Sequence, residues 1–478
     1  MSNKLPLKVG TLHFIGIGGI GMSGIAETLK HMGYEVQGSD MKEGDNVDRL
    51  REKGIRVLIG HNPENIMDEN GAPVAAVIRS TAVKENNAEV LAARAENIPV
   101  IRRAEMLAEI MRLKPSIAIA GTHGKTTTTS LVGQMLERCD CDPTIINGGI
   151  INAYQSNARM GNGDWMVVEA DESDGTFTML PAIAGVITNI DPEHMDHYGS
   201  FDELKAAFLK FVRNLPFYGK VAACIDHPTV RELMPEFSRQ VVAYGESEDA
   251  DLRLLNLQTN AEGQSFDIVL QGELHQGFLL PMYGKHNVLN ACAALAVGHE
   301  VGLTIDCMRR ALADFNGVKR RFTRTGVGAG ITVIDDYGHH PVEITAVLKA
   351  AREAVTNSDA NDGRVIAVVQ PHRYSRLKSL FVDFAACFDE ADKVIVADVY
   401  AAGEDPIDGA DKKSLAAAIG DNAIILDSED KLAETVYKVA RPGDFVICLG
   451  AGTITQWAAR LPGELEVMTT PTKANGTH

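Results

Sequence analysis

The chain has 478 residues, of which 45% are hydrophobic, and a formal net charge of −18. Because a single hydrophobic core rarely grows beyond about 250–300 residues, this length predicts two or three domains. The acidic excess argues against a nucleic-acid-binding protein, which needs clustered Lys and Arg to neutralise phosphates.

The start of the chain has no signal-peptide pattern, and no run of 18 apolar residues predicts a membrane span. The seven cysteines are scattered, which favours reduced thiols over a disulfide framework. These features predict a cytoplasmic protein and leave its oligomeric state open.

Strands and helices alternate along the first part of the chain. The expected strands cover residues 12–16, 34–38, 56–59, 75–78 and 98–101, and the expected helices cover 21–31, 87–96 and 104–111. Such alternation predicts a parallel sheet with helices on its faces. Because Pro115 stops the last helix, we place the end of the first domain at residue 113.

Two further α/β regions follow. A strand at 116–120, a glycine loop and a helix through residue 136 open a central domain that we expect to span 114–318. A third domain is expected at 319–464, with strands at 365–369, 393–397 and 445–449. We expect the chain to fray just after Pro462, and we assign residues 465–478 to a polar tail outside the third domain.

Residues 16–21 read Gly-Ile-Gly-Gly-Ile-Gly and fit G-x-G-x-x-G between a predicted strand and helix. Glycines let the backbone approach a pyrophosphate, which the helix N-terminus also attracts. Asp40 lies about 20 residues on, where a dinucleotide enzyme binds ribose. NAD(P), a UDP group with the same pyrophosphate, and a packing turn without ligand all stay open at this point.

Residues 121–128 read Gly-Thr-His-Gly-Lys-Thr-Thr-Thr and also link a predicted strand to a helix. This loop is a P-loop in role, although Ile119 stands where the general pattern has its first glycine. Its backbone N–H groups cradle phosphates, Lys125 reaches the β- and γ-phosphates, and Thr126 holds Mg²⁺. The second loop therefore predicts ATP.

Acidic loops after two apolar strands predict metal ligands. Glu169 lies within an apolar run and is expected to be half-buried, where a carboxylate needs a cation. Asp171, Glu172 and Asp174 fit a solvated loop as well as a ligand set. His194 shares its loop with two Asp and another His, which favours a second Mg²⁺ site over a structural histidine.

Taken together, these motifs resemble the Mur ligase family. The segments G-I-G-G-I-G-M, G-T-H-G-K-T-T-T, E-A-D-E-S-D, D-P-E-H-M-D, G-K-H-N-V-L-N and R-R-F occur in the family's order. Residues 335–341, 371–376 and 398–404 look like the branch that adds L-alanine. A sister ligase that adds a murein tripeptide is the nearest rival, but the compact charged segment 371–376 favours a single amino acid.

The resemblance implies an α/β fold with three domains: an N-terminal Rossmann-like parallel sheet, a central P-loop ATPase-like domain and a C-terminal Rossmann-like domain. It implies ATP- and Mg²⁺-dependent joining of L-alanine to UDP-N-acetylmuramate through an acyl phosphate, for peptidoglycan biosynthesis. Mn²⁺ is expected to substitute for Mg²⁺. Two alternatives predict different behaviour. An NAD(P)-dependent oxidoreductase would leave the Lys125 loop unused. A non-catalytic ATP switch would bind ATP, but an amino acid would not stimulate phosphate release.

The resemblance also implies four groups of site residues. The UDP-sugar would contact Gly18, Gly19, Ile20, Gly21, Met22, Ser39, Asp40, His61, Ser80 and Arg103. ATP would contact Gly121, Thr122, His123, Gly124, Lys125, Thr126, Thr127, His286, Asn287, Asn290, Arg321 and Asp336. Metal would be held by Thr126, Glu169 and His194, and L-alanine would be surrounded by Tyr337, His339, His372, Arg373 and Arg376. The catalytic group would be Lys125, His194, Arg321 and Asp336.

One departure bears on the second metal. Several Mur ligases bridge the metals with a carbamoylated lysine after the His-Met-Asp stretch, but here no lysine occurs before Lys205. The L-alanine-adding branch is similar in lacking it, so the completion of that metal shell stays open. The general base also stays open between His339 and His372. We further expect the third domain to close on ATP and sugar, which would exclude water from the acyl phosphate.

Overall fold

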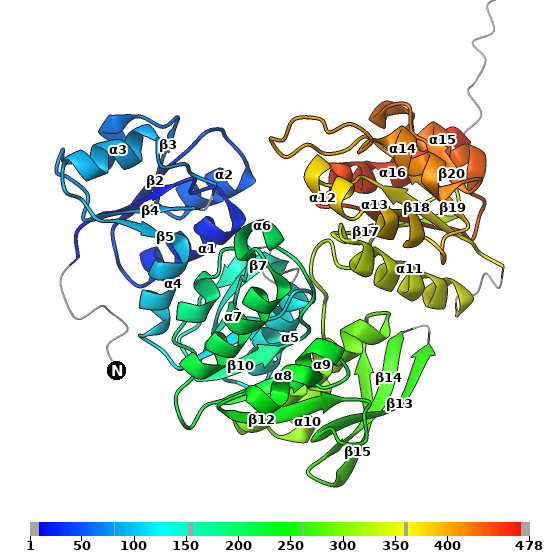
Figure 1. The fold of residues 1–478 in the computed structure, drawn as a ribbon, viewed down its shortest axis with the longest axis horizontal. Coiled ribbons are helices and arrows are strands. Elements are labelled where there is room, and N and C mark those ends of the chain that lie inside the picture. Colours follow the sequence, from blue (N-terminus) through cyan, green and yellow to red (C-terminus); the bar gives the residue numbers. More distant parts are fainter. Residues whose placement is uncertain (1–8, 81, 152–155, 261, 358–361, 470–478) are drawn as a thin grey trace, which may run out of the picture. The chain divides into compact units, whose positions relative to one another are not determined.

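The computed structural model describes residues 9–80, 82–151, 156–260, 262–357 and 362–469 (Figure 1), without the side chains of residues 20, 149–151 and 196. The chain forms two compact units. One comprises Met1–Leu255, Asp267–Phe278 and Leu289–Asn316, and the other comprises Asn256–Phe266, Leu279–Val288 and Gly317–His478. None of the described helices is long and apolar enough to cross a membrane.

The N-terminal sheet is parallel throughout, as the sequence predicts, with strand order β3-β2-β1-β4-β5. Its strands are β1 (Leu12–Ile15), β2 (Val36–Asp40), β3 (Arg56–Ile59), β4 (Ala76–Arg79) and β5 (Val100–Arg102). Its helices are α1 (Ile20–His31), α2 (Asp45–Glu52), η1 (Pro63–Ile66), α3 (Ala88–Ala95) and α4 (Arg103–Met111). Helix α2 was not predicted, because it is highly charged and buries only Val47 and Leu50.

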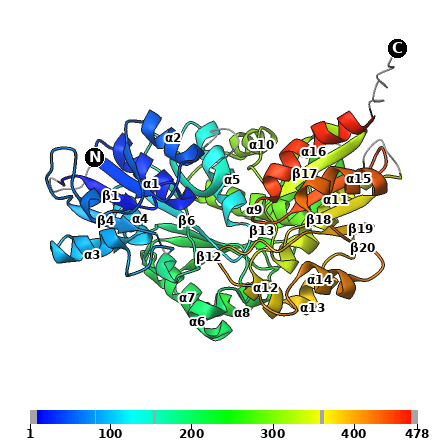
Figure 2. The ribbon, with the colours of Figure 1, turned by 90° about the horizontal axis from the view of Figure 1, so that it is seen from above.

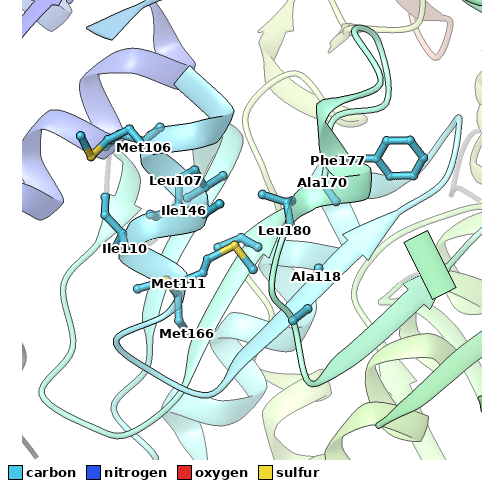
Figure 3. Packing of buried hydrophobic residues seen from close by; sticks show 14 of the residues in the cluster. Met106, Leu107, Ile110, Met111, Ala118, Ile146, Met166, Ala170, Phe177 and Leu180 are labelled. Atoms are coloured by element: carbon cyan, nitrogen blue, oxygen red, sulfur yellow. The ribbon is translucent and has the colours of Figure 1, made fainter. Parts of the chain in front are cut away.

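Helix α4 joins this sheet to the central one. Met106, Leu107, Ile110 and Met111 are buried on it and belong to one hydrophobic cluster with residues of the central sheet (Figure 3). The view shows Leu107, Ile110 and Met111 beside Ile146 and Met166 of the central sheet, which belong to the same cluster. Burial of apolar side chains is the main source of folding free energy, so α4 is a packed connection and not a loose linker.

The central sheet is mixed, with strand order β15-β14-β13-β12-β11-β10-β6-β9-β7-β8. Its strands are β6 (Ser116–Ala120), β7 (Thr144–Ile151), β8 (Ser156–Arg159), β9 (Met166–Glu169), β10 (Ala184–Ile187), β11 (Lys220–Cys224), β12 (Gln240–Gly245), β13 (Leu252–Asn260), β14 (Gly263–Leu270) and β15 (Glu273–Leu280). Its helices are α5 (Lys125–Arg138), η2 (Thr176–Met179), α6 (Met195–Tyr198), α7 (Phe201–Asn214), α8 (Pro228–Leu233), η3 (Met234–Glu236), α9 (Lys285–Glu300) and α10 (Ile305–Ala313). Strand β6 pairs in parallel with β10 and β9, and therefore lies within the sheet.

A disulfide connects two of these helices. Cys139, at the end of α5, is bonded to Cys307, in the first turn of α10, and their Cα atoms are 5.8 Å apart. The prediction that all seven cysteines are reduced thiols is therefore wrong for this pair. The two residues lie 168 positions apart, and only the packing of α10 on α5 brings them together, which spacing in the sequence does not reveal.

The third sheet has the order β16-β17-β21-β18-β19-β20, and β16 is its antiparallel strand. Its strands are β16 (Thr323–Gly328), β17 (Ile331–Asp336), β18 (Val365–Val369), β19 (Lys393–Val396), β20 (Ala423–Ile425) and β21 (Phe445–Leu449). Its helices are α11 (Pro341–Thr356), α12 (Tyr374–Ser379), α13 (Phe381–Ala386), α14 (Lys412–Ile419), η4 (Glu429–Lys431), α15 (Leu432–Val439) and α16 (Ile454–Thr469). Helices α11 and α16 pack on opposite faces of the sheet, which lies between them in Figure 1, and Figure 2 views the same layers from above.

Helix α16 corrects the predicted tail. It runs through Pro462 to Thr469, where we expected a frayed end just after the proline. Leu461 and Leu465 are fully buried against the third sheet, and this burial outweighs the cost of proline in a helix. Strand β16 leaves room for the ring, since a Cβ on Gly326 would lie 3.0 Å from it.

Candidate active site

The residues predicted to bind a UDP-sugar gather at the carboxyl edge of the N-terminal sheet. The glycine loop follows β1, Ser39 and Asp40 end β2, His61 follows β3, Ser80 follows β4, and Arg103 follows β5. Open parallel sheets bind their ligands at this edge. The side chain of Ile20 lies outside the described part of the chain, and Met22 is buried in the core.

The first glycine loop is held by side chains around it. The Gly18 N–H donates to the Asp40 carboxylate at 2.9 Å, and the Asn46 amide donates to the Gly18 carbonyl at 2.7 Å. Asp40 therefore supports the loop itself. A Cβ on Gly21 would collide with the Arg103 guanidinium, so the loop and Arg103 lie in contact.

Arg103 also connects the first sheet to the central one. Its Nη2 donates to the Asp171 carboxylate at 3.0 Å. Burial raises the pKa of Asp171, but Arg103 and Lys125 outweigh this effect and hold it below its usual value. This ion pair places the predicted sugar-nucleotide edge beside the acidic loop that follows β9.

The second glycine loop is held by hydrogen bonds to the segment that follows β10. The His123 N–H donates to the Asn189 side-chain oxygen at 2.7 Å, and the Thr188 hydroxyl donates to the His123 carbonyl at 2.6 Å. Gly124 is the N-cap of helix α5 with φ of 83°, and a Cβ there would lie 2.6 Å from the Asn290 oxygen. Sequence reasoning missed Asn189, which has the signal of a polar residue directly after a buried strand.

Lys125 is buried in this loop and paired with a carboxylate. Its Nζ lies 2.9 Å and 2.8 Å from the two oxygens of Glu172, and it donates to the Gly121 and Thr122 carbonyls. Burial lowers the pKa of Lys125, but Glu172, Glu169 and Asp171 raise it above its ordinary value. Thr126 and Thr127 follow in the first turn of α5, and both are buried.

Glu172, Glu193 and His194 each offer a ligand atom within 4.8 Å of one another, which makes them a candidate metal centre. Glu172 is fully buried, and neighbouring glutamates raise the pKa of His194 although burial lowers it. His194 was predicted as a metal ligand, whereas Glu172 was left open and Glu193 was missed. Glu193 has a visible signal, because it precedes His194 in the D-P-E-H-M-D segment.

Glu169 lies outside that cluster. It is half-buried, as predicted, and accepts a hydrogen bond from the Gly148 N–H at 3.0 Å. Two carboxylates and an imidazole suit a divalent cation, and carboxylate oxygens are the ligands that Mg²⁺ prefers. The donor set of the cluster therefore fits the predicted metal, and the charge of Glu169 helps to raise the pKa of Lys125. The side chain of Asp196 is not described.

In the second unit, aromatic and basic side chains meet after β17 and β18. Tyr337 packs against His339 with ring centroids 5.1 Å apart, His339 lies 5.8 Å from His372, and His372 stacks on Tyr400. Burial and neighbouring positive charges lower the pKa of His372 to about 4. Arg373 has an unusual φ of 69°. The structure thus brings together Tyr337, His339 and His372 of the predicted amino-acid site.

Asp336, at the end of β17, orders the preceding segment. It accepts hydrogen bonds from the Phe322 and Gly338 N–H groups, both at 2.7 Å, and burial raises its pKa to about 6. The Arg321 guanidinium lies over the Tyr337 ring, 5.3 Å from its centroid. Burial and Arg321 lower the pKa of His286 to about 4. Asn287 donates to the Tyr283 carbonyl.

Comparisons with known proteins agree with this geometry. The Mur ligase family catalytic domain matches residues 11–115, the Mur ligase middle domain matches 119–298, and the Mur ligase glutamate ligase domain matches 320–452. The UDP-N-acetylmuramate–L-alanine ligase of Rhodopseudomonas palustris (strain HaA2) is 57% identical over 97% of this chain and 99% of its own. That of Brucella anthropi is 56% identical over 97% of this chain and 98% of its own.

Solved structures give the same result. A UDP-N-acetylmuramate–alanine ligase, MurC, from Thermotoga maritima superposes with a TM-score of 0.80 and 29% identity, and the match covers 96% of this chain and 99% of the other. A murein peptide ligase from Psychrobacter arcticus has a TM-score of 0.69 and 21% identity over 96% and 99%, which shows a shared fold. The chain belongs to the Mur ligase family.

Proposed function

We propose that this chain joins L-alanine to UDP-N-acetylmuramate, using ATP and Mg²⁺, as a step of peptidoglycan biosynthesis. The observation that carries the proposal is the buried Lys125 of the second glycine loop beside the Glu172, Glu193 and His194 cluster. A phosphate-binding lysine next to a cation site is what transfer of the γ-phosphoryl group requires. The 57% identity to a ligase of this name over nearly the full length supports the choice of substrates.

The first half-reaction activates the sugar carboxylate. A carboxylate oxygen of the muramic acid attacks the γ-phosphorus of ATP, the bond to the β-phosphate oxygen breaks, and ADP leaves. Lys125 exchanges its bond with Glu172 for the phosphate oxygens and neutralises their charge. Glu172, Glu193 and His194 hold the metal, which supplies further charge neutralisation when bound.

In the second half-reaction the alanine amine attacks the acyl carbon, and phosphate leaves as the amide forms. Arg373 and Arg376 are proposed to bind the alanine carboxylate, since guanidinium groups pair with carboxylates in a bidentate way. A pKa of about 4 makes His372 a weak base, so we assign the amine proton to His339. His339 is oriented by the Tyr337 carbonyl at 3.1 Å.

The remaining assignments follow the family pattern. The proposal places Arg321, Asp336, His286, Asn287 and Asn290 against ATP. It keeps Thr126, Glu169 and His194 as metal ligands, with Mn²⁺ able to substitute for Mg²⁺, and it places the protein in the cytoplasm.

Trapping the acyl phosphate tests the mechanism. The chain is incubated with ATP, Mg²⁺ and UDP-N-acetylmuramate but no amino acid, and hydroxylamine is added. The proposal predicts a sugar hydroxamate and one ADP for each hydroxamate formed. L-alanine, glycine, L-serine and the murein tripeptide are then supplied in separate reactions. Amide formation with the tripeptide in place of L-alanine would contradict the substrate assignment, and no hydroxamate would contradict the mechanism.

A further inference from the structure

A buried carboxylate lies beneath the sugar-nucleotide edge of the N-terminal sheet. Glu89, in the first turn of α3, is fully buried, as are His13 on β1 and Ser39 at the end of β2. Its Oε2 accepts from the Ser39 hydroxyl at 2.7 Å and lies 3.5 Å from His13 Nε2, and its Oε1 accepts from the Asn65 amide. An ionised carboxylate survives burial only with such donors around it.

The pattern of donors fixes which ring nitrogens carry hydrogen. The Glu89 carboxylate, an acceptor 3.5 Å from His13 Nε2, places a hydrogen on that nitrogen, whereas His13 Nδ1 faces the Gln37 amide nitrogen at 3.4 Å, which cannot accept one. Burial raises the pKa of Glu89, but these hydrogen bonds outweigh it and keep the pKa below its usual value. Glu89 therefore stays ionised and acts only as an acceptor.

The consequence reaches His61 through Ser39. The Ser39 hydroxyl has one hydrogen, which it donates to Glu89, so towards His61 Nδ1, 3.1 Å away, it acts as an acceptor. His61 Nδ1 consequently carries a hydrogen, and Nδ1 also lies 3.5 Å from Glu89 Oε2. In the neutral ring the opposite nitrogen, Nε2, is then the acceptor, and the His61 side chain remains 16% exposed.

We propose that Glu89 is a positioning residue for the sugar-nucleotide site, acting through Ser39 to hold the His61 ring with Nε2 as an acceptor. The inference rests on the proposed function, which places UDP-N-acetylmuramate at this edge. The ligand group that faces His61 is then a hydrogen-bond donor, an N–H or a hydroxyl of the nucleotide. The same strand end serves the loop as well, since the next residue, Asp40, holds Gly18.

A double-mutant cycle tests this role. Glu89→Gln places an amide donor among the Ser39, His13 and Asn65 donors, and His61→Ala removes the group that Glu89 positions. We expect Glu89→Gln to raise KM for UDP-N-acetylmuramate about tenfold, with kcat and the KM values for ATP and L-alanine within about twofold. In the His61→Ala background the same change is expected to alter KM by less than about twofold.

Two further variants guard against a folding defect. Ser39→Ala removes only the linking hydroxyl and is expected to raise KM for the sugar nucleotide about fivefold, with unchanged circular dichroism. Glu96→Gln makes the same chemical change at the exposed C-cap of α3 and is expected to leave every constant unchanged. Additive effects of Glu89→Gln and His61→Ala, or a fall in kcat alone, would overturn the inference. A wild-type chain inactive with UDP-N-acetylmuramate would instead overturn the proposed function.

Discussion

The two glycine loops have the same backbone plan and different side chains. Each follows a buried strand and opens a helix, β1 to α1 in one case and β6 to α5 in the other. The first is supported by Asp40, which accepts from Gly18, and its helix begins without a charged residue in the first turn. The second begins its helix with Lys125, which is paired with the buried Glu172.

This difference separates binding from chemistry. A loop of backbone N–H groups at a helix N-terminus holds a phosphate group in place, which suits the diphosphate of a sugar nucleotide, since that part of the substrate does not react. Phosphoryl transfer also requires movable positive charge and a cation, and only the second loop brings a lysine and a carboxylate–histidine cluster together in the described part of the chain. The loops therefore predict different responses to the same kinds of change.

The largest effect is expected from Lys125→Met. Loss of the lysine charge should lower kcat by about 10³-fold or more, because this charge neutralises the transferring phosphate in the transition state. Phosphate release under saturating substrates measures this. The matched control is Lys30→Met in α1, the helix after the first loop, where the lysine pairs with an exposed glutamate and kcat should not change.

Lys125→Met also leaves Glu172 buried without its partner, which should cost about 3–5 kcal/mol of stability. The pair Lys125→Met with Glu172→Gln should regain most of that stability and none of the activity. If the double variant released phosphate at the wild-type rate, the role assigned to the second loop would be wrong.

The second-largest effect concerns the Cys139–Cys307 disulfide, which fixes the end of α5, the helix after the second glycine loop. The Cys139–Cys307 disulfide closes a loop of 168 residues, so its reduction should destabilise the fold by about 3–5 kcal/mol in the chain-entropy account. We expect the melting temperature to fall by about 5–8 °C in dithiothreitol or in Cys307→Ser. Cys141→Ser, which leaves the bond intact, is the control. A melting temperature unaffected by reductant would contradict the bond.

Alanine at one glycine of each loop should separate the two loops by substrate. Gly124 has φ of 83° and faces Asn290, so Gly124→Ala costs about 1–2 kcal/mol of strain and should raise KM for ATP about tenfold. Gly18→Ala would bring a methyl group within 2.9 Å of Asp40 and should raise KM for UDP-N-acetylmuramate instead. Initial rates with each substrate varied in turn measure both. Crossed effects would contradict the assignment of the loops.

The smallest effect is expected from pH, at opposite extremes for the two regions. The pKa of Glu89 is lowered, so its stabilisation is present above the unfolded value of 4.5 and is lost as pH falls below it. The pKa of Lys125 is raised, so its stabilisation is present below 10.5 and is lost as pH rises above it. The free energy of unfolding is measured in urea for the wild type, Glu89→Gln and Lys125→Met across both pH ranges. Glu89→Gln should remove only the loss of stability at low pH, and Lys125→Met only the loss at high pH.

The sequence was sufficient to predict those strands and loops whose own residues carry the characteristic pattern. Strands 56–59, 116–120 and 365–369 were predicted with the bounds of β3, β6 and β18, because short apolar runs between turn residues leave little choice. Both glycine loops lie between a strand and a helix, as predicted. The parallel N-terminal sheet followed from alternation alone.

Contacts between distant segments could not be predicted. Glu172 reads as one of several acidic loop residues, and only the fold places it, buried, on Lys125. The Cys139–Cys307 bond depends on how α10 packs on α5, and helix α16 continues past Pro462 because the third sheet buries Leu465. The role inferred for Glu89 likewise depends on Ser39 of β2 and His61 of the loop after β3.

The most direct test of the account is phosphate release from ATP and Mg²⁺ by the full chain. The reaction is run with UDP-N-acetylmuramate alone, with L-alanine alone and with both. The account predicts sustained release only when both are present, with one UDP-N-acetylmuramoyl-L-alanine formed for each phosphate. Sustained release without the sugar nucleotide, or no release with both substrates, would contradict the claim that the two glycine loops bind the two halves of one ligation.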